Sequence, residues 1–313
     1  MAEIRRNPAW LLLAVAVVAL FTLLGSRGLN EPDEGRYAEI GREMAATGEW
    51  LVPHLNGFEH FQKPPLLYWA TGLAIRLFGA NEWAARLPSA LAALGTVMLT
   101  GRLGCTLFHR RAGFLAGLIL LSSTGFFILA RLLTPDMTLT FWVTAAGACF
   151  VQYAYALQGR KWAWLFFACL GCGFLTKGPM ALIIPLSAAM AWQIAARRRP
   201  AAPSLPWVRG LLLTLAISLS WFVALSLWRH ELFDYFWRYE LVERFASHAH
   251  GRSKPMWFFI PVTLVAVVPW VFLAPGLGLA AWRQWRERRV SLAGWLLFGW
   301  TIPPFIILSL SGS

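Results

Sequence analysis

The chain has 313 residues, of which 58% are hydrophobic and only 14% charged, and its formal net charge is +13. This balance excludes a soluble globule, and several apolar runs are long enough to cross a bilayer. The basic residues fall in short clusters between the apolar runs, so the charge indicates membrane topology and not a nucleic-acid-binding face. We therefore expect an all-α, polytopic membrane protein whose partners include membrane lipids and no nucleic acid.

The apolar runs predict about nine membrane spans. The first, Pro8–Leu24, follows Arg5-Arg6 and is not followed by a small-residue cleavage site, so we interpret it as an uncleaved span. The remaining spans are predicted at Ala84–Leu107, Ala112–Ala130, Thr138–Leu157, Trp162–Leu175, Met180–Ala196, Val208–Leu227, Met256–Trp282 and Leu292–Leu310.

With these spans, every basic cluster between them falls on one side, which the positive-inside rule makes cytoplasmic. The N-terminus is then cytoplasmic, and residues 26–83 and 228–254 form periplasmic loops. The apolar stretch Leu66–Phe78 is short and contains Arg76. Counting it as a span would move all later basic clusters outside, so we predict a juxtamembrane helix there.

The first outer loop is the longest stretch without a membrane-length apolar run. Asp33 follows Pro32 at a position typical of an N-cap, and a short helix is predicted from Asp33 to Met44, ended by Thr47-Gly48. Lys63-Pro64-Pro65 then fixes an extended approach to the juxtamembrane helix. A solvated charged loop is the alternative, but the mixture of acids, prolines and large aromatic residues favours a functional site.

The informative ionisable residues all fall on the outer side of the predicted membrane. Two carboxylates from separate loops suit proton abstraction or the binding of a divalent cation. Several Lys and Arg side chains suit a phosphate group. Acids and phosphate-binding bases that face a membrane surface suggest a lipid-phosphate substrate. These residues are Asp33, Glu34, Lys63, Arg131, Asp136, Lys177, Arg244, His248, His250, Arg252 and Lys254.

Several of these residues have an ordinary structural alternative. Asp136 follows a proline and could cap the fourth span. Lys177 could simply extend toward the membrane interface. His248 and His250 have an H-x-H spacing that is weak support for a metal site. Lys254 could contact only lipid headgroups.

A set of short motifs runs from the end of the first span to the last outer loop. These motifs include Pro32-Asp33-Glu34-Gly35-Arg36-Tyr37, Gly48-Glu49-Trp50, Lys63-Pro64-Pro65, Ala85-Arg86-Leu87-Pro88-Ser89, Thr134-Pro135-Asp136, Leu175-Thr176-Lys177-Gly178-Pro179, Arg244-Phe245 and Lys254-Pro255. As a set they resemble the membrane-embedded GT-C glycosyltransferases of the protein mannosyltransferase and aminoarabinose (lipid A) transferase family, a family 39-like group, and its bacterial lipid-modifying branch in particular.

The resemblance implies a GT-C helix bundle with periplasmic juxtamembrane helices in the bacterial inner membrane. It implies transfer of a sugar from a polyprenyl (undecaprenyl) phosphate donor to a lipid A-like or other periplasmic acceptor, with inversion at the anomeric carbon. By position, Asp33 and Asp136 match catalytic carboxylates, and a divalent cation between them is left open. The donor-phosphate residues would be Arg36, Lys63, Lys177 and Arg244, with Glu34, Tyr37, His250 and Lys254 as further candidates.

Two departures from the family pattern qualify this expectation. Gln62 stands where many lipid A transferases have an acid before the KPP lysine, which argues against metal binding and against strict lipid A specificity. Family members also continue with more spans beyond the position of Ser313, so we expect one GT-C domain at 1–313 whose C-terminal part is missing. The alternatives are a lipid or sugar-lipid transporter (a flippase) without chemistry, for which no inverted repeat is visible, and an inactive fragment.

Overall fold

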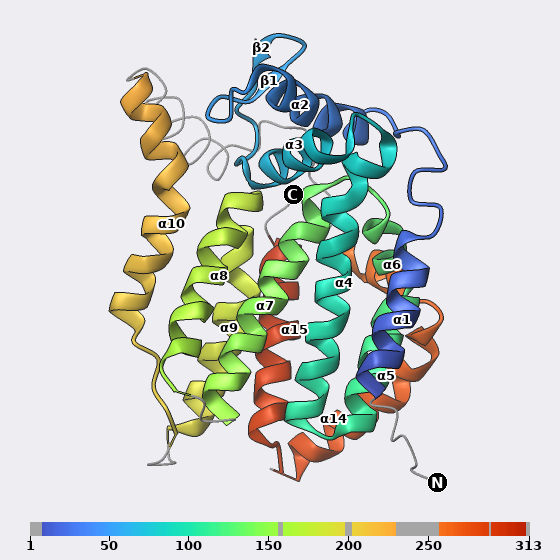
Figure 1. Cartoon of the computed structure of the whole chain (residues 1–313). Coiled ribbons are helices and arrows are strands. Elements are labelled where there is room, and N and C mark those ends of the chain that lie inside the picture. The colour runs from blue at the N-terminus through green and yellow to red at the C-terminus, as the bar shows by residue number, and fades with distance from the viewer. Residues whose placement is uncertain (1–7, 156–158, 198–201, 230–256, 288, 311–313) are drawn as a thin grey trace, which may run out of the picture.

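The computed structural model describes residues 8–155, 159–197, 202–229, 257–287 and 289–310. Long helices run side by side in a bundle, and a small cap lies across one end of it (Figure 1). The cap consists of α2 (Asp33–Thr47), a short hairpin of β1 (His54–Leu55) and β2 (Phe58–Glu59), and α3 (Leu66–Phe78). The expectation of a helical membrane bundle with juxtamembrane helices is confirmed, with this hairpin as an addition that the sequence did not predict.

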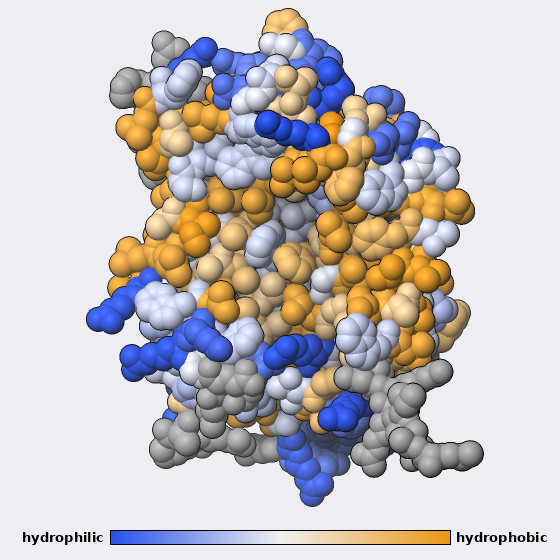
Figure 2. Space-filling model, viewed as in Figure 1, coloured by the Kyte–Doolittle hydropathy of each residue, from blue (hydrophilic) through white to orange (hydrophobic). Residues whose placement is uncertain are grey.

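The bundle is apolar around its middle and polar at both ends (Figure 2). Its largest buried cluster lies where α7, α8, α9 and α15 pack together and includes Phe150, Phe166, Phe167 and Trp192. The bundle helices are α1 (Pro8–Phe21), α4 (Glu82–Leu107), α5 (Arg110–Ser122), α6 (Thr124–Ala130), α7 (Pro135–Tyr155), α8 (Lys161–Lys177), α9 (Met180–Ala196), α10 (Trp207–Trp228), α13 (Phe259–Ala266), η2 (Trp270–Leu273), α14 (Ala274–Arg286) and α15 (Leu292–Leu310).

Within the described ranges, three helices (α4, α10 and α15) are long and apolar enough to cross a membrane by themselves, or five spans if each of two bent helix pairs counts as one. Helices α1, α3 and α9 are apolar but shorter. The larger number of spans in the sequence analysis stays a prediction. The bounds predicted for Leu66–Phe78, Met180–Ala196 and Leu292–Leu310 are those of α3, α9 and α15.

The span predicted at Ala112–Ala130 is not one straight helix, because α5 and α6 meet at a bend of 69°. The bend falls at Ser123, whose hydroxyl donates to the carbonyl of Ile119 at 2.7 Å, while the Ser122 hydroxyl donates to Leu118 at 2.6 Å. Serine hydroxyls that bond back to the preceding turn weaken the regular backbone pattern and favour a break.

The span predicted at Met256–Trp282 is also bent. Its described part is divided into α13, η2 and α14, with a bend of 106°. Pro269 lies at this break and has no N–H to continue a helix. Each of the two breaks provides hydrogen-bond partners for polar groups at the other. The Thr124 N–H donates to the Val268 carbonyl at 2.9 Å, and the Trp270 indole donates to the Ser122 hydroxyl at 3.0 Å. Irregular backbone at membrane depth requires such internal partners.

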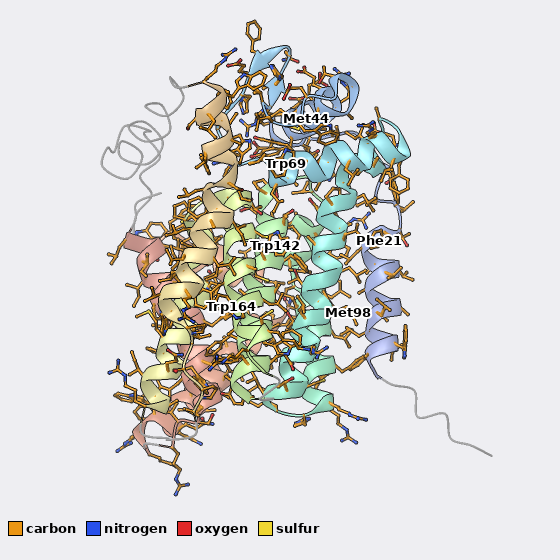
Figure 3. All side chains as sticks on the ribbon, turned by 60° about the vertical axis from the view of Figure 1, so that its left-hand side comes forward. Phe21, Met44, Trp69, Met98, Trp142 and Trp164 are labelled. Atoms are coloured by element: carbon orange, nitrogen blue, oxygen red, sulfur yellow. The ribbon has the colours of Figure 1, made fainter. Side chains whose placement is uncertain are left out.

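The cap has its own small core, made by one face of α2 against α3. Tyr37, Ile40 and Met44 are buried there with Leu67, as the predicted helical spacing required. Helix α2 continues three residues beyond the predicted Met44 and ends at Gly48, whose φ of 76° suits a left-handed C-cap. Figure 3 places Met44 within the cap and Trp69 below it, toward the bundle.

Two tryptophans tie the cap to the helices around it. The Trp69 indole of α3 donates to the Trp50 carbonyl at 2.6 Å. The Trp221 indole of α10 donates to the Leu51 carbonyl at 2.9 Å, and Trp221 is only 2% exposed. The loop between α2 and the hairpin is therefore fixed against both α3 and the cap end of α10.

Candidate active site

The predicted site residues within the described ranges come from segments that meet where the cap rests on the bundle. Asp33 and Arg36 lie in the first turns of α2, and Lys63 lies just before α3. Asp136 lies in the first turn of α7, and Lys177 is the last residue of α8. Helix α8 extends beyond the predicted Leu175, so Lys177 is part of a helix and not of the following turn.

Glu34 lies at the centre of this junction and is only 1% exposed. Its carboxylate accepts hydrogen bonds from Arg86 of α4, from Nε at 2.8 Å and from Nη2 at 3.0 Å. It also accepts the backbone N–H of Leu133 at 2.9 Å. Because Glu34 follows Asp33 and Leu133 shortly precedes Asp136, one buried carboxylate connects the two segments that carry the predicted catalytic acids.

The environment of Glu34 keeps it ionised. Burial by itself raises the pKa of this carboxyl, but hydrogen bonds from Arg86, Asn30, Leu133 and Arg27 outweigh burial and lower the pKa to about 2. Arg86 is 0% exposed and also donates to the carbonyls of the chain between α1 and α2. Glu34, predicted as a further site candidate, is therefore engaged in holding the junction together.

A second arginine holds the loop before α7 against the end of α1. The Arg131 guanidinium donates to the carbonyls of Ala19 at 3.0 Å and Thr22 at 2.8 Å, where helix α1 ends. In return, Arg27 donates to the Arg131 carbonyl at 2.9 Å. Arginine near a helix C-terminus satisfies carbonyls that have no partner within the helix. The position of Asp136 is thus set from two sides.

Asp33 does not cap helix α2 as predicted. The helix begins at Asp33 itself, Pro32 occupies the cap position, and no side chain caps the first turn. The Asp33 carboxylate instead accepts a hydrogen bond from Arg36 at 2.6 Å. The side chains of Asp33 and Arg36 are 59% and 30% exposed, so this ion pair remains accessible to a ligand.

Tyr37 links the acids of the two segments. Its ring lies under the Arg36 guanidinium at 5.1 Å and is 5.9 Å from the ring of Tyr68. Burial raises the pKa of the Tyr37 hydroxyl, the Arg36 charge opposes this, and the charges of both Asp33 and Asp136 raise the pKa further. Both carboxylates therefore lie within electrostatic reach of one phenol hydroxyl, although they come from different segments.

Asp136 forms an ion pair with Lys177 across helices α7 and α8. The two side chains are 42% and 30% exposed. Lys177 therefore has a partner within the protein, which the alternative that it merely extends toward the membrane interface does not account for. Asp136 lies in the first turn of α7, and the capping role considered for it stays a prediction beside this pairing.

Lys63 is half-buried in the KPP turn and lies directly before helix α3, which begins at Leu66. His60, three residues before Lys63 and directly after β2, is also half-buried. Burial lowers the pKa of His60, and the positive charge of Arg36 lowers it further. The KPP turn and the start of α2 are thus electrostatic neighbours.

An apolar groove of about 560 Å³ leads away from this end of the bundle between α3, α4 and α7. It is lined by Trp69 of α3, Leu91 of α4, and Phe141 and Trp142 of α7. Figure 3 shows Trp69 in the cap and Trp142 below it in the bundle. Thr138, two residues after Asp136 in α7, also lines the groove, so the groove reaches the start of α7, although neither Asp136 nor Lys177 lines it.

Five residues named from the sequence lie outside the described residues: Arg244, His248, His250, Arg252 and Lys254. Within the described ranges, no group of three or more His, Cys, Asp or Glu side chains could hold a metal ion. Asp33 and Asp136 each have a basic partner. The geometry therefore gives the suggested divalent cation no further support.

Sequence reasoning assigned no role to Arg86, Arg27 or Tyr68. A signal for Arg86 existed, because an arginine inside the apolar run that becomes α4 requires a carboxylate partner, and the first outer loop is rich in acids. Tyr68 gave no such signal, since an aromatic residue in an apolar stretch is ordinary. Its burial beside Tyr37 depends on the packing of α3 on α2.

A helical bundle with membrane-span candidates and a cap of short helices across one end define a multi-pass membrane protein with the GT-C fold. Residues 9–276 match the family described as dolichyl-phosphate-mannose-protein mannosyltransferase, and the chain belongs to this family.

Among curated proteins, the chain is 34% identical over 314 aligned residues to the undecaprenyl phosphate-alpha-4-amino-4-deoxy-L-arabinose arabinosyl transferase of Edwardsiella ictaluri, covering 98% of this chain and 56% of that protein. The crystal structure of ArnT from Cupriavidus metallidurans in the apo state has a TM-score of 0.84 at 30% identity, covering 97% of this chain and 55% of ArnT. The same protein bound to undecaprenyl phosphate has a TM-score of 0.79, covering 96% and 58%. The chain thus spans about half the length of the relatives it matches.

Proposed function

We propose that this chain forms the catalytic membrane domain of a polyprenyl-phosphate-dependent glycosyltransferase. The sugar would be 4-amino-4-deoxy-L-arabinose carried on undecaprenyl phosphate, as the names of the similar proteins indicate. The acceptor would be lipid A or a related lipid, as the family resemblance of the motifs implies. The observation that carries the proposal is the meeting of two acid–base pairs, Asp33–Arg36 and Asp136–Lys177, next to the start of an apolar groove.

The basic residues would bind the donor phosphate and stabilise the charge that develops on it as the sugar departs. Arg36 and Lys177 are partly exposed at this end, and Lys63 is held before a stiff proline pair. Buried donors nearby without a hydrogen-bond partner, such as Arg36 Nε and the Tyr68 hydroxyl, would serve the same anion or its sugar. Lys and Arg both bind phosphate, and Arg offers a two-pronged contact.

The carboxylates would act on the acceptor. Asp33 would deprotonate an acceptor hydroxyl, because a carboxylate within reach of the nucleophile can accept its proton in the transition state. If the acceptor is an ionised phosphate, no base is required and Asp33 would orient it. Asp136, held by Lys177, would complete the electrostatic environment.

The apolar groove would accommodate part of the polyprenyl tail. Its lining is almost entirely hydrophobic and aromatic, which suits an isoprenoid chain. The groove begins near the Asp136–Lys177 pair, so a lipid in it would bring its phosphate to the charged groups. A transporter would also use a groove and a charged site, but it would not require two carboxylates paired with cations at one end.

The site would face the periplasm of the bacterial inner membrane, because the positive-inside rule places the opposite end in the cytoplasm. Cysteine labelling with an impermeant reagent tests this orientation. Phe58 at the hairpin is 79% exposed, and Arg110 at the start of α5 is also exposed. Phe58→Cys should be labelled in intact spheroplasts, and Arg110→Cys only after permeabilisation. The reverse pattern would refute the orientation.

The decisive experiment measures sugar transfer by the complete gene product from the undecaprenyl-phosphate donor to lipid A, with mass spectrometry of the product. Asp33→Asn and Asp136→Asn should each lower transfer by on the order of a hundredfold. The matched control is Glu39→Gln on the same helix α2, where Glu39 pairs with Arg42 instead. Wild-type transfer by both Asn variants, or movement of donor without product, would reject the proposal.

A further inference from the structure

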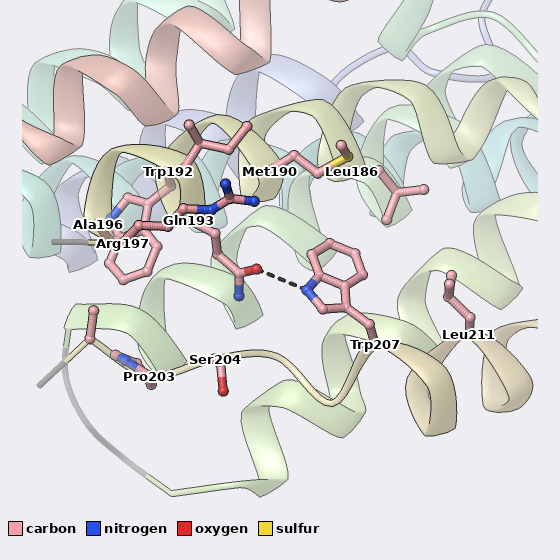
Figure 4. Close-up of a pocket in the computed structure, with 12 residues that line it drawn as sticks. Leu186, Met190, Trp192, Gln193, Ala196, Arg197, Pro203, Ser204, Trp207 and Leu211 are labelled. Atoms are coloured by element: carbon pink, nitrogen blue, oxygen red, sulfur yellow. Dashed lines mark hydrogen bonds between the residues drawn. The ribbon is translucent and has the colours of Figure 1, made fainter. Parts of the chain in front are cut away.

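A second large cavity, of about 800 Å³, opens at the end of the bundle opposite the candidate active site. It lies between the last turns of α9 and the start of α10, including the segment that leads into α10 (Figure 4). Of the residues considered for sugar transfer, none that the structure describes lines it. Its chemistry therefore requires a separate explanation.

The cavity changes from apolar to polar along helix α9. Leu186, Met190 and Ile194 form its apolar side, and Arg197 lies at its polar end. With a rise of about 1.5 Å per residue, the stretch from Leu186 to Arg197 is roughly 17 Å long, close to half of a bilayer core of about 30 Å. Met190 and Ile194 are 52% and 57% exposed, so an acyl chain could reach them from the membrane.

The polar end offers hydrogen-bond donors. The Trp207 indole donates to Gln193 Oε1 at 2.8 Å, which fixes the amide and leaves Gln193 Nε2 buried without a hydrogen-bond partner (Figure 4). The Arg197 side chain lies beside this amide in the same view. No Asp or Glu is among the residues that line the cavity. Donors and a positive charge at the end of an apolar channel suit an anionic headgroup.

We propose that this cavity binds an anionic phospholipid of the leaflet on the Arg197 side. One acyl chain would lie along Leu186, Met190 and Ile194, and the phosphate would contact Arg197 and the Gln193 amide. The site is independent of the donor lipid, because it lies at the other end of the bundle.

Native mass spectrometry of the complete, delipidated gene product tests the headgroup preference. Phosphatidylglycerol and phosphatidylethanolamine with identical acyl chains would be titrated against it. The wild type should retain phosphatidylglycerol preferentially, and Arg197→Gln should weaken its binding about fivefold, the effect of one arginine near an anionic lipid. The control is Arg110→Gln, an exposed arginine outside the cavity, which should leave binding unchanged. Equal retention of both lipids, or equal effects of the two variants, would overturn the proposal.

Photo-crosslinking identifies the occupant directly. A photoreactive amino acid at position 194, which is on the exposed edge of the cavity, should give an adduct with the mass of a phospholipid in membranes. Adding Arg197→Gln should reduce the phosphatidylglycerol adduct. An adduct with another segment of the chain, or with a second copy, would show that protein covers the cavity and would overturn the proposal.

Discussion

The buried Glu34–Arg86 pair permits a quantitative prediction about the junction. Glu34→Gln keeps the size of the side chain but replaces one acceptor oxygen by a donor amide. Glu34 is 1% and Arg86 0% exposed, so the arginine would keep its charge in a site without water and without its carboxylate partner. Removing one member of a buried ion pair costs about 3–5 kcal/mol of unfolding free energy.

The expected readout is the midpoint of thermal unfolding of the purified protein in detergent. A loss of this size should lower Tm by roughly 10 °C. The control is Glu39→Gln, because Glu39 pairs with Arg42 on the partly exposed face of the same helix. An ion pair of that kind contributes at most about 1 kcal/mol, so the control should change Tm by only a few degrees.

A double variant separates the pair from the individual side chains. Glu34→Gln combined with Arg86→Gln should cost clearly less than the sum of the two single losses, because neither charge is left unpaired. The Arg86 guanidinium also donates to the Leu24 and Gly28 carbonyls, so the double variant should remain less stable than the wild type. Additive losses, or a Tm of Glu34→Gln near that of the wild type, would refute the reasoning.

The other predictions concern Lys63, acid stability and Gly48. Lys63→Ala should lower sugar transfer by on the order of a hundredfold, and Lys63→Arg should restore only part of it, since a planar fork does not replace a compact ammonium; equal transfer by the Arg variant and the wild type would contradict this. The pKa of Glu34 is lowered from 4.5 to about 2, so the stability that its charge contributes is complete above about pH 4.5 and is lost as the pH falls toward 2. The Tm difference between wild type and Glu34→Gln should therefore shrink over that range, and a constant difference would disprove this pH dependence. Gly48→Ala should cost about 1 kcal/mol because φ is 76°, and an unchanged Tm would speak against this account of the C-cap.

Hydropathy along the sequence was sufficient for much of the architecture. The bounds of α3, α9 and α15 follow from where apolar runs begin and end, because membrane helices must be apolar over their whole length. The distribution of basic clusters identified Leu66–Phe78 as a helix that does not need to cross, and the structure places α3 across the end of the bundle (Figure 1). Both signals are local or additive along the chain, so no knowledge of packing was required.

The helix breaks could not be predicted in this way. Ser123 and Pro269 occur within runs that are apolar overall, and hydropathy averages over them. Whether such a position bends a helix depends on partners for the freed backbone groups. Here each break supplies them for the other, through the contact between Thr124 and Val268, which are 144 positions apart.

The candidate site shows the same difference between what the sequence predicts and what only the tertiary structure determines. Motif residues such as Asp33, Asp136 and Lys177 could be named from the sequence, because their chemistry and their neighbouring prolines and glycines are visible in it. Their pairing could not, since the Asp136–Lys177 pair joins positions 41 apart, and Glu34 reaches Leu133 over 99 positions. Asp33 and Glu34 are neighbouring acids in the sequence, yet the Asp33 side chain is exposed and the Glu34 side chain is buried against Arg86. Only the tertiary contact between Glu34 of α2 and Arg86 of α4 determines which carboxylate is held in the fold and which one stays exposed, because burial of a charge depends on the partner that the tertiary structure provides.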